Sequence, residues 1–177
     1  MRFIPDITWH GAPIHGAAVA IGIFDGVHQG HQAILNEGIK AGLPVIAVTF
    51  DPHPTAVFAP DRTPTKLLTI KNRVHQLATH GASTVAVIKF TEEFSKLSPQ
   101  EFIDQVLVPI FEPQIVIVGE NFTFGAKAAG NVKFLAENAS FKVKAMPLQT
   151  QGDIAVSSTR IREAIRAGNI EIANQLL

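Results

Sequence analysis

Two histidines, His28 and His31, lie in a glycine-rich segment that joins a predicted strand to a predicted helix. The segment contains three glycines, Gly22, Gly26 and Gly30. Glycines let a ligand approach the backbone closely, and the free N–H groups at a helix start favour anions. Each imidazole can donate a hydrogen bond to a phosphate oxygen. Residues 21–31 therefore predict a phosphate-binding turn suited to charge that grows during a reaction.

Zinc binding by His28, His31 and His53 is an alternative, because two histidines on a helix and a third elsewhere can form a catalytic site. The glycine-rich turn favours an anion over a metal ion. The sequence also contains no helical HExxH pattern that would supply a base. We therefore prefer the phosphate site.

A second predicted helix opens with three hydroxyl residues, Ser157, Ser158 and Thr159. Arg162 follows one turn later, with a guanidinium fork that suits phosphate. A plain capping cluster followed by a solvated arginine would explain these residues equally well in isolation. Two anion sites on separate helix starts at one sheet edge, however, suggest a polyphosphate that bridges them. We therefore predict that both helix starts converge on one triphosphate.

The second predicted strand ends at His53, which lies between two prolines in the run TFDPHP. The prolines stiffen the backbone and would aim the imidazole from the edge where ligands bind, although a rigid strand exit with an exposed histidine is the alternative. Phe58 is either a loop anchor or an aromatic wall for a planar ring. The stretch 51–68 contains four prolines and little periodicity, and we expect a mobile flap there.

Another predicted strand ends in the run GENFTFG, residues 119–125. Asn121 offers both a donor and an acceptor. Phe122 and Phe124 would point to opposite sides of an extended chain, so that one packs inward and one faces a ligand. A turn with two core aromatic residues is the alternative.

Short apolar runs alternate with segments of helical spacing along the chain. The predicted strands are 17–24, 44–50, 84–90, 114–119 and 141–148. The predicted helices are 32–40, 70–80, 99–111 with Ser98 as N-cap, 131–138, and a last one after the hydroxyl residues. This order predicts an α/β fold with a mainly parallel sheet covered by helices on both faces. Ligands bind such sheets at the carboxyl ends of the strands.

The composition excludes several classes of protein. The chain has 177 residues, of which 46% are hydrophobic, and fits one domain. Fifteen Lys and Arg balance fifteen Asp and Glu, so no global positive field favours nucleic acid. No apolar stretch approaches the roughly 18 residues of a membrane span. The first residues show no signal peptide, and cysteine is absent, so we expect a cytoplasmic protein with neither nucleic-acid nor membrane partner.

Four motifs together resemble a known family. The runs GIFDGVHQGHQ, TFDPHP, VGENFTFG and VSSTRIREAI match, in order and spacing, the FMN adenylyltransferase module of prokaryotic FAD synthetases, the first half of bifunctional riboflavin kinase/FMN adenylyltransferases. The match covers nearly the whole chain. An HxGH turn alone identifies only the wider nucleotidylyltransferase superfamily. The PHP and NFTFG segments restrict the resemblance to the members that act on a flavin. The resemblance implies a Rossmann-like nucleotidylyltransferase fold with five or six strands.

The same resemblance implies a reaction of ATP with FMN that gives FAD and pyrophosphate, with Mg²⁺ as cofactor and no covalent enzyme intermediate. The implied catalytic residues are His28, His31, Ser158 and Arg162. The implied ATP-binding residues are Gly22, Phe24, Asp25, Gly26, His28, Gly30, His31, Ser157, Ser158, Thr159 and Arg162, with Asp25 a nucleotide contact or a turn cap. The implied FMN-binding residues are His53, Phe58, Asn121, Phe122 and Phe124, with Asn121 also near Mg²⁺.

Two departures from the family pattern limit what the resemblance implies. The kinase module of the relatives would follow the last leucines, so we expect residues 1–177 to form one adenylyltransferase domain without kinase activity. Many relatives carry a basic residue where Ala155 stands, which predicts weaker nucleotide binding here. Two other functions remain open: transfer to another phosphorylated acceptor, and a nucleotide- or flavin-binding module without turnover.

Overall fold

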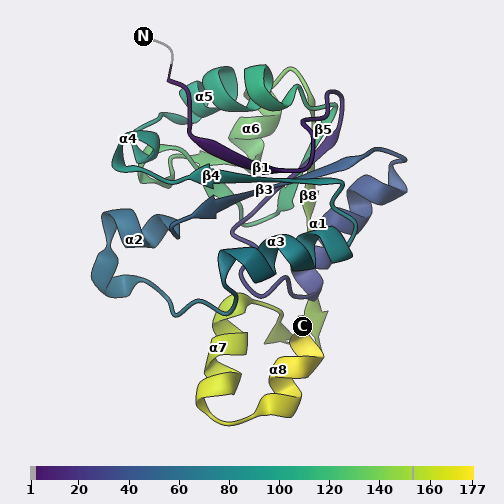
Figure 1. Cartoon of the computed structure of the whole chain (residues 1–177), viewed down its shortest axis with the longest axis vertical. Coiled ribbons are helices and arrows are strands. Elements are labelled where there is room, and N and C mark those ends of the chain that lie inside the picture. Colours follow the sequence, from purple (N-terminus) through teal and green to yellow (C-terminus); the bar gives the residue numbers. More distant parts are fainter. Residues whose placement is uncertain (1–2, 153) are drawn as a thin grey trace.

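A six-stranded sheet lies between two layers of helices in the computed structural model, which describes residues 3–152 and 154–177 (Figure 1). The strand order is β1-β4-β3-β2-β5-β8. The strands are β1 (Ile7–His10), β2 (Ala18–Ile21), β3 (Val45–Asp51), β4 (Thr84–Lys89), β5 (Ile115–Gly119) and β8 (Lys142–Met146). All neighbours pair in parallel except β1, which is antiparallel to β4. The predicted α/β fold with a mainly parallel sheet is confirmed.

The edge strand β1 is absent from the predicted strands. Its four residues alternate between half-buried and exposed, because only one face of this edge strand packs on the core. Such a strand has no continuous apolar run. The five predicted strands are all found, although the first ends at Ile21 rather than at residue 24.

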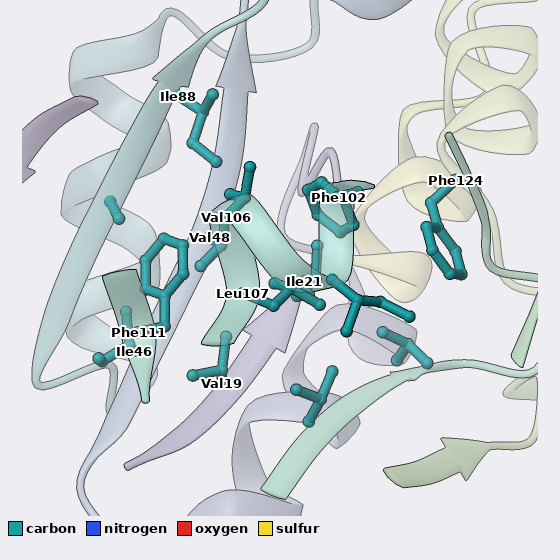
Figure 2. Packing of buried hydrophobic residues seen from close by; sticks show 14 of the residues in the cluster. Val19, Ile21, Ile46, Val48, Ile88, Phe102, Val106, Leu107, Phe111 and Phe124 are labelled. Carbon is teal, nitrogen blue, oxygen red and sulfur yellow. The ribbon is translucent and has the colours of Figure 1, made fainter. Parts of the chain in front are cut away.

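Alternate residues of the central strands point to opposite faces of the sheet and pack into two separate cores. Val19 and Ile21 of β2 pack with α5 (Pro99–Phe102), with the π-helical segment η2 (Ile103–Phe111) and with α6 (Val132–Asn138) (Figure 2). Ala18 and Ala20 face the other core, which α1 (Gln29–Lys40) and α3 (Ile70–Thr79) cover. The prediction of helices on both faces is therefore confirmed. No described helix has the length and apolar character that crossing a membrane requires.

The predicted helix 99–111 begins as expected at Ser98. The Ser98 hydroxyl accepts a hydrogen bond from the N–H of Glu101, and the Glu101 carboxylate accepts one from the N–H of Ser98. This reciprocal pair satisfies two N–H groups that a helix start leaves without partners. The segment then continues as η2 to Phe111, so the prediction was right about its extent and wrong about its regular α-helical geometry.

Replacing Ser98 by alanine should lower the free energy of unfolding by about 1 kcal/mol, because the N-cap hydroxyl is lost. Urea denaturation measures this change. Ser140→Ala, at an exposed position, is the matched control and should change stability by less than about 0.5 kcal/mol. Equal effects of the two substitutions would contradict the capping role.

The stretch 51–68, expected to form a mobile flap, contains two short helices, α2 (Pro54–Phe58) and η1 (Pro60–Arg62), despite its lack of helical periodicity. Its mobility stays a prediction. The remaining elements are α4 (Glu92–Ser95), β6 (Thr123–Phe124), η3 (Ala126–Ala128), β7 (Gly130–Asn131), β9 (Thr150–Gln151), β10 (Ile154–Ala155), α7 (Ser158–Arg166) and α8 (Ile170–Leu176).

The last two helices, α7 and α8, form a hairpin outside the main sheet (Figure 1). A small apolar cluster of their own residues, together with Val156 and Leu67, holds the hairpin together. The side-chain amides of Gln29 and Gln32 donate to the carbonyl oxygens of Gln175 and Leu177. These bonds fix the hairpin against the start of α1, the helix that follows the glycine-rich turn.

Candidate active site

A cavity of about 360 Å³ opens at the carboxyl ends of β2 and β5. These two strands are neighbours, but the chain runs outward from β2 through β3 to β4 on one side and from β5 to β8 on the other. Such a reversal of strand order leaves a crevice in which α/β proteins bind ligands. The cavity is lined by Ile21, Gly22, Ile23, Asp25, His28, Gly30, His31, Ile34, His53, Gly119, Asn121, Phe122, Thr123, Met146, Pro147, Leu148, Gln149, Val156, Ser157, Ser158 and Arg162.

Both predicted anion-binding helix starts border this cavity. His28 lies at the N-cap position of α1 without a capping hydrogen bond, and the Ser157 hydroxyl caps α7 by accepting from the N–H of Arg160. The Ser158 hydroxyl donates to the backbone carbonyl oxygen of Asp25 over 2.7 Å, which ties the start of α7 directly to the glycine-rich turn. The two helix starts therefore meet at one cavity, as predicted, and their binding of one triphosphate stays a prediction.

The imidazole rings of His28 and His31 stack with their centroids 3.6 Å apart. The Nδ1 atoms of both rings are buried and have no hydrogen-bond partner among the described residues. The edge of the Phe24 ring packs against His31 with a centroid distance of 5.1 Å. Gly30 makes room for the pair, because a Cβ there would lie 3.2 Å from the His28 ring. The structure thus holds two imidazoles with unused hydrogen-bonding capacity in a cavity wall.

Burial keeps both imidazoles neutral. It lowers the pKa of His28 to about 4, with a smaller contribution from the positive charge of Arg162. Burial also places the pKa of His31 well below its ordinary value, helped by His28 and by the charge of Arg73. At neutral pH each ring therefore offers one N–H donor and no net charge. The positive charge of the site must come from arginine.

Protein stability should fall as the pH drops from about 6.5 to 4. In this window the unfolded chain binds a proton at His28 and the folded chain does not, so acidification favours the unfolded state. The shift corresponds to about 3 kcal/mol. Urea unfolding at pH 7 and pH 4 measures it, with His28→Gln as the control that cannot titrate. An equal pH dependence in both proteins would show that His28 does not hold this shifted pKa.

The carboxylate of Asp25 is not open to solvent. Its carboxylate, only 2% exposed, accepts hydrogen bonds from the backbone N–H groups of Leu67 and Leu68 and binds Arg162 over 2.5 Å. Arg162 also donates from Nε to the carbonyl oxygen of Thr65 over 2.6 Å. The alternative in which Arg162 is solvated is therefore wrong, because its guanidinium group is buried at the cavity wall. The carboxylate thus binds the segment before α3 rather than its own turn, so the structure does not show the predicted turn cap, and a contact of Asp25 with nucleotide stays a prediction.

Three residues assigned to ATP do not line the cavity. Phe24 is fully buried and supports the ring of His31 from behind. Gly26 lies beneath Leu67, at a smaller cavity on the far side of the turn. Thr159 is exposed on the first turn of α7. Their placement has one cause: successive residues of a tight turn or helix start point in different directions.

Two residues assigned to FMN also lie outside the cavity. Phe58 is 65% exposed on α2. Phe124 is buried in the core, where its ring contacts Phe102 and Phe134. The expectation that Phe122 and Phe124 point to opposite sides is wrong, because the chain turns after Gly119 and the two rings stack 5.5 Å apart.

The other residues assigned to FMN, His53, Asn121 and Phe122, line the cavity as predicted. The Nδ1 atom of His53 accepts a hydrogen bond from the N–H of Thr55, and burial lowers the pKa of its imidazole. The cavity-lining segment 146–149, which begins at the last residue of β8, is absent from the predicted site residues. The position of this segment at the end of a predicted parallel strand is the sequence signal that could have placed it at the cavity.

The donor set of the cavity does not form a protein cage for a metal ion. Within residues 3–152 and 154–177, no group of three His, Cys, Asp or Glu side chains could hold one. The zinc alternative for His28, His31 and His53 is therefore not supported. Mg²⁺ differs, because it commonly binds through substrate phosphates and water with one or two protein oxygens. Asn121 has an exposed side chain at the cavity wall, and its binding of Mg²⁺ stays a prediction.

The chain is similar in sequence to proteins of known description. A sequence model of the FAD synthetase family matches residues 12–160. A bifunctional riboflavin kinase/FMN adenylyltransferase of Listeria monocytogenes is 39% identical over 166 residues, covering 90% of this chain and 52% of that protein. The Escherichia coli protein of the same description is 34% identical over 173 residues, covering 94% and 55%. The chain thus spans about half the length of the curated relatives it matches.

Two solved structures share the fold. A Streptococcus pneumoniae structure described as a macrolide-efflux protein superposes with a TM-score of 0.83 at 28% identity, covering 94% of this chain and 57% of that one. A pantoate-beta-alanine ligase of Francisella tularensis, complexed with beta-gamma ATP and beta-alanine, gives a TM-score of 0.58 at 17% identity, covering 90% and 69%. The second likeness concerns the fold alone.

Proposed function

Because this chain belongs to the FAD synthetase family, we propose that it transfers the adenylyl group of ATP to FMN, giving FAD and pyrophosphate. The observation that carries the proposal is the convergence of two helix starts, with their histidines, hydroxyls and arginine, on one cavity. Residues 1–177 would act as a single adenylyltransferase unit. The kinase activity named for the longer relatives is not part of the proposal.

The proposed reaction is a direct displacement. A phosphate oxygen of FMN forms a bond to the α-phosphorus of ATP, while the bond to the bridging oxygen of the β-phosphate breaks and its electron pair leaves with pyrophosphate. Such a transfer requires alignment and charge stabilisation rather than a protein nucleophile. A chain without cysteine, in whose cavity wall His28 and His31 stack on each other, fits that requirement.

The residues of the two helix starts would bind the triphosphate. His28 and His31 would donate hydrogen bonds to ATP phosphates, and the backbone N–H groups at the starts of α1 and α7 would add further donors. Arg162 would supply positive charge as negative charge moves onto the leaving pyrophosphate. Neutral imidazoles suit this task, because they donate hydrogen bonds without competing with Arg162 for a counter-ion.

The opposite wall would bind FMN. Phe122 offers an aromatic face to the flavin ring, while Asn121 and His53 offer polar groups for its phosphate and hydroxyls. Mg²⁺ would neutralise phosphate charge when bound, and Asn121 would contribute one oxygen to it. ATP as a substrate and the absence of cysteine both support a cytoplasmic location.

Incubation of the purified chain with ATP, Mg²⁺ and FMN, followed by separation of the flavins, tests the proposal. We expect FAD and an equal amount of pyrophosphate. Competition with pantetheine phosphate and nicotinate mononucleotide tests the acceptor, and FMN should be adenylylated in preference to both. Tight binding of ATP and FMN without pyrophosphate release would instead identify a binding module without turnover.

A further inference from the structure

The carboxylate of Asp25 lies between two buried arginines. Arg162, from α7, binds it directly, and an Nη atom of Arg73, from α3, lies 3.9 Å away. Arg73 is 2% exposed and Arg162 is 9% exposed. One carboxylate therefore faces two guanidinium groups, and the carboxylate of Asp51, which pairs with Lys66, also attracts the charge of Arg73. The N–H groups of Leu67 and Leu68 complete the surroundings of the carboxylate.

Arg73 has no place in the cavity itself. It donates from Nη1 to the hydroxyl oxygen of Thr49 and to the carbonyl oxygen of Phe50, both at the end of β3. Its Nε atom is buried and unpartnered among the described residues. A buried arginine with incomplete hydrogen bonding contributes little to the stability of a fold, because an apolar side chain of similar volume would often give equal stability. The positive charge of Arg73, rather than its packing, therefore needs a functional explanation.

Arg162 has capacity left for a ligand. Its Nε atom binds Thr65 and one Nη group binds Asp25, while the other Nη group has no hydrogen-bond partner in the described part of the chain. For Arg162 to turn fully toward a phosphate it must loosen its bond to Asp25. A carboxylate left alone in this buried position would oppose that movement, because an unpaired buried charge is strongly unfavourable.

We propose that Arg73 is a positioning residue that keeps Asp25 compensated, so that Arg162 can exchange the carboxylate for a phosphate group of the substrate. Arg73 and the two backbone N–H groups hold Asp25 in both states. Thr65 keeps the Arg162 side chain at the cavity wall during the exchange. The identity of the phosphate ligand as ATP rests on the proposed function.

Calorimetric titration with ATP and Mg²⁺ tests this role. Arg73→Met should weaken ATP binding about tenfold, because Asp25 then has only Arg162 as a charged partner. In the Arg162→Ala background the same substitution should change ATP binding less than twofold. Arg73→Lys, which keeps the charge, should restore the affinity to within threefold of wild type. Arg166→Met, at an exposed position on α7, is the matched control and should leave binding unchanged.

Equal weakening in the two backgrounds, or no weakening in either, would overturn the proposal. Should Arg73→Met fail to fold, Asp25→Asn with and without Arg73→Met provides the test, since removal of the carboxylate charge removes the need for Arg73. These two proteins should bind ATP equally within twofold, and a fivefold difference would overturn the inference. The binding test is independent of turnover. If the effect of Arg73→Met on ATP binding depends on Arg162 but the chain makes no FAD, the proposed adenylyl transfer is rejected and the role of Arg73 is not.

Discussion

Replacing His28 by alanine should lower kcat for FAD formation by about 100-fold or more, the scale of removing one preorganised donor from a reacting centre. The buried Nδ1 atom of this imidazole is unpartnered in the described part of the chain, and the side chain lines the cavity beside Arg162. Removal also takes away the ring that stacks on His31, which then keeps only its contact with the ring of Phe24. Steady-state rates at saturating ATP and FMN measure the loss.

His75→Ala is the matched control, because this histidine is exposed on α3, outside the cavity. It should leave kcat within twofold of wild type. The thermal unfolding midpoint of each variant separates a catalytic loss from a folding loss. A folded His28→Ala protein with wild-type turnover would show that the phosphate site lies elsewhere.

Phe124→Ala should lower the free energy of unfolding by about 3 to 5 kcal/mol, the usual effect of emptying a buried phenylalanine site. The ring is 8% exposed and packs between Phe102, Phe122 and Phe134. Because Phe124 lies in the core and not at the cavity, the fraction that stays folded should bind FMN with little change. Urea denaturation gives the stability, and flavin fluorescence titration gives the affinity.

Phe122→Ala and Phe58→Ala provide the comparison. Phe122 lines the cavity, so its loss should weaken FMN binding more than the loss of Phe124 does. Phe58 is exposed, and its loss should change stability by less than about 0.5 kcal/mol. A Phe124→Ala protein of normal stability with impaired flavin binding would move this residue from the core to the site.

Interactions between neighbours in the chain could be predicted, since they depend on few residues. The N-cap at Ser98 and its bond with Glu101 depend on residues within one helical turn. The location of the proposed anion sites follows similarly from glycine, hydroxyl and histidine residues at helix starts. The convergence of the two sites could be predicted as well, because parallel strands bring their carboxyl ends to one edge.

Side-chain direction could not be predicted where the chain turns irregularly. The opposite orientation expected for Phe122 and Phe124 assumed an extended chain, but a backbone hydrogen bond from Phe122 to Gly119 closes a turn there. The sequence around Arg73 resembles any amphipathic surface helix, because nothing within one turn of it shows that a carboxylate lies against that face.

The amino-acid sequence alone determined the α/β class, the two helix starts and the residue types there that we propose bind phosphate, because these depend on local backbone geometry and on the strand-helix order. Only the tertiary structure decided which side chains and backbone N–H groups bind the carboxylate of Asp25. Its partners Leu67 and Arg162 lie 42 and 137 positions away along the chain. Contacts over such separations form when the elements pack, since burial removes competing water and forces each charge to find a partner.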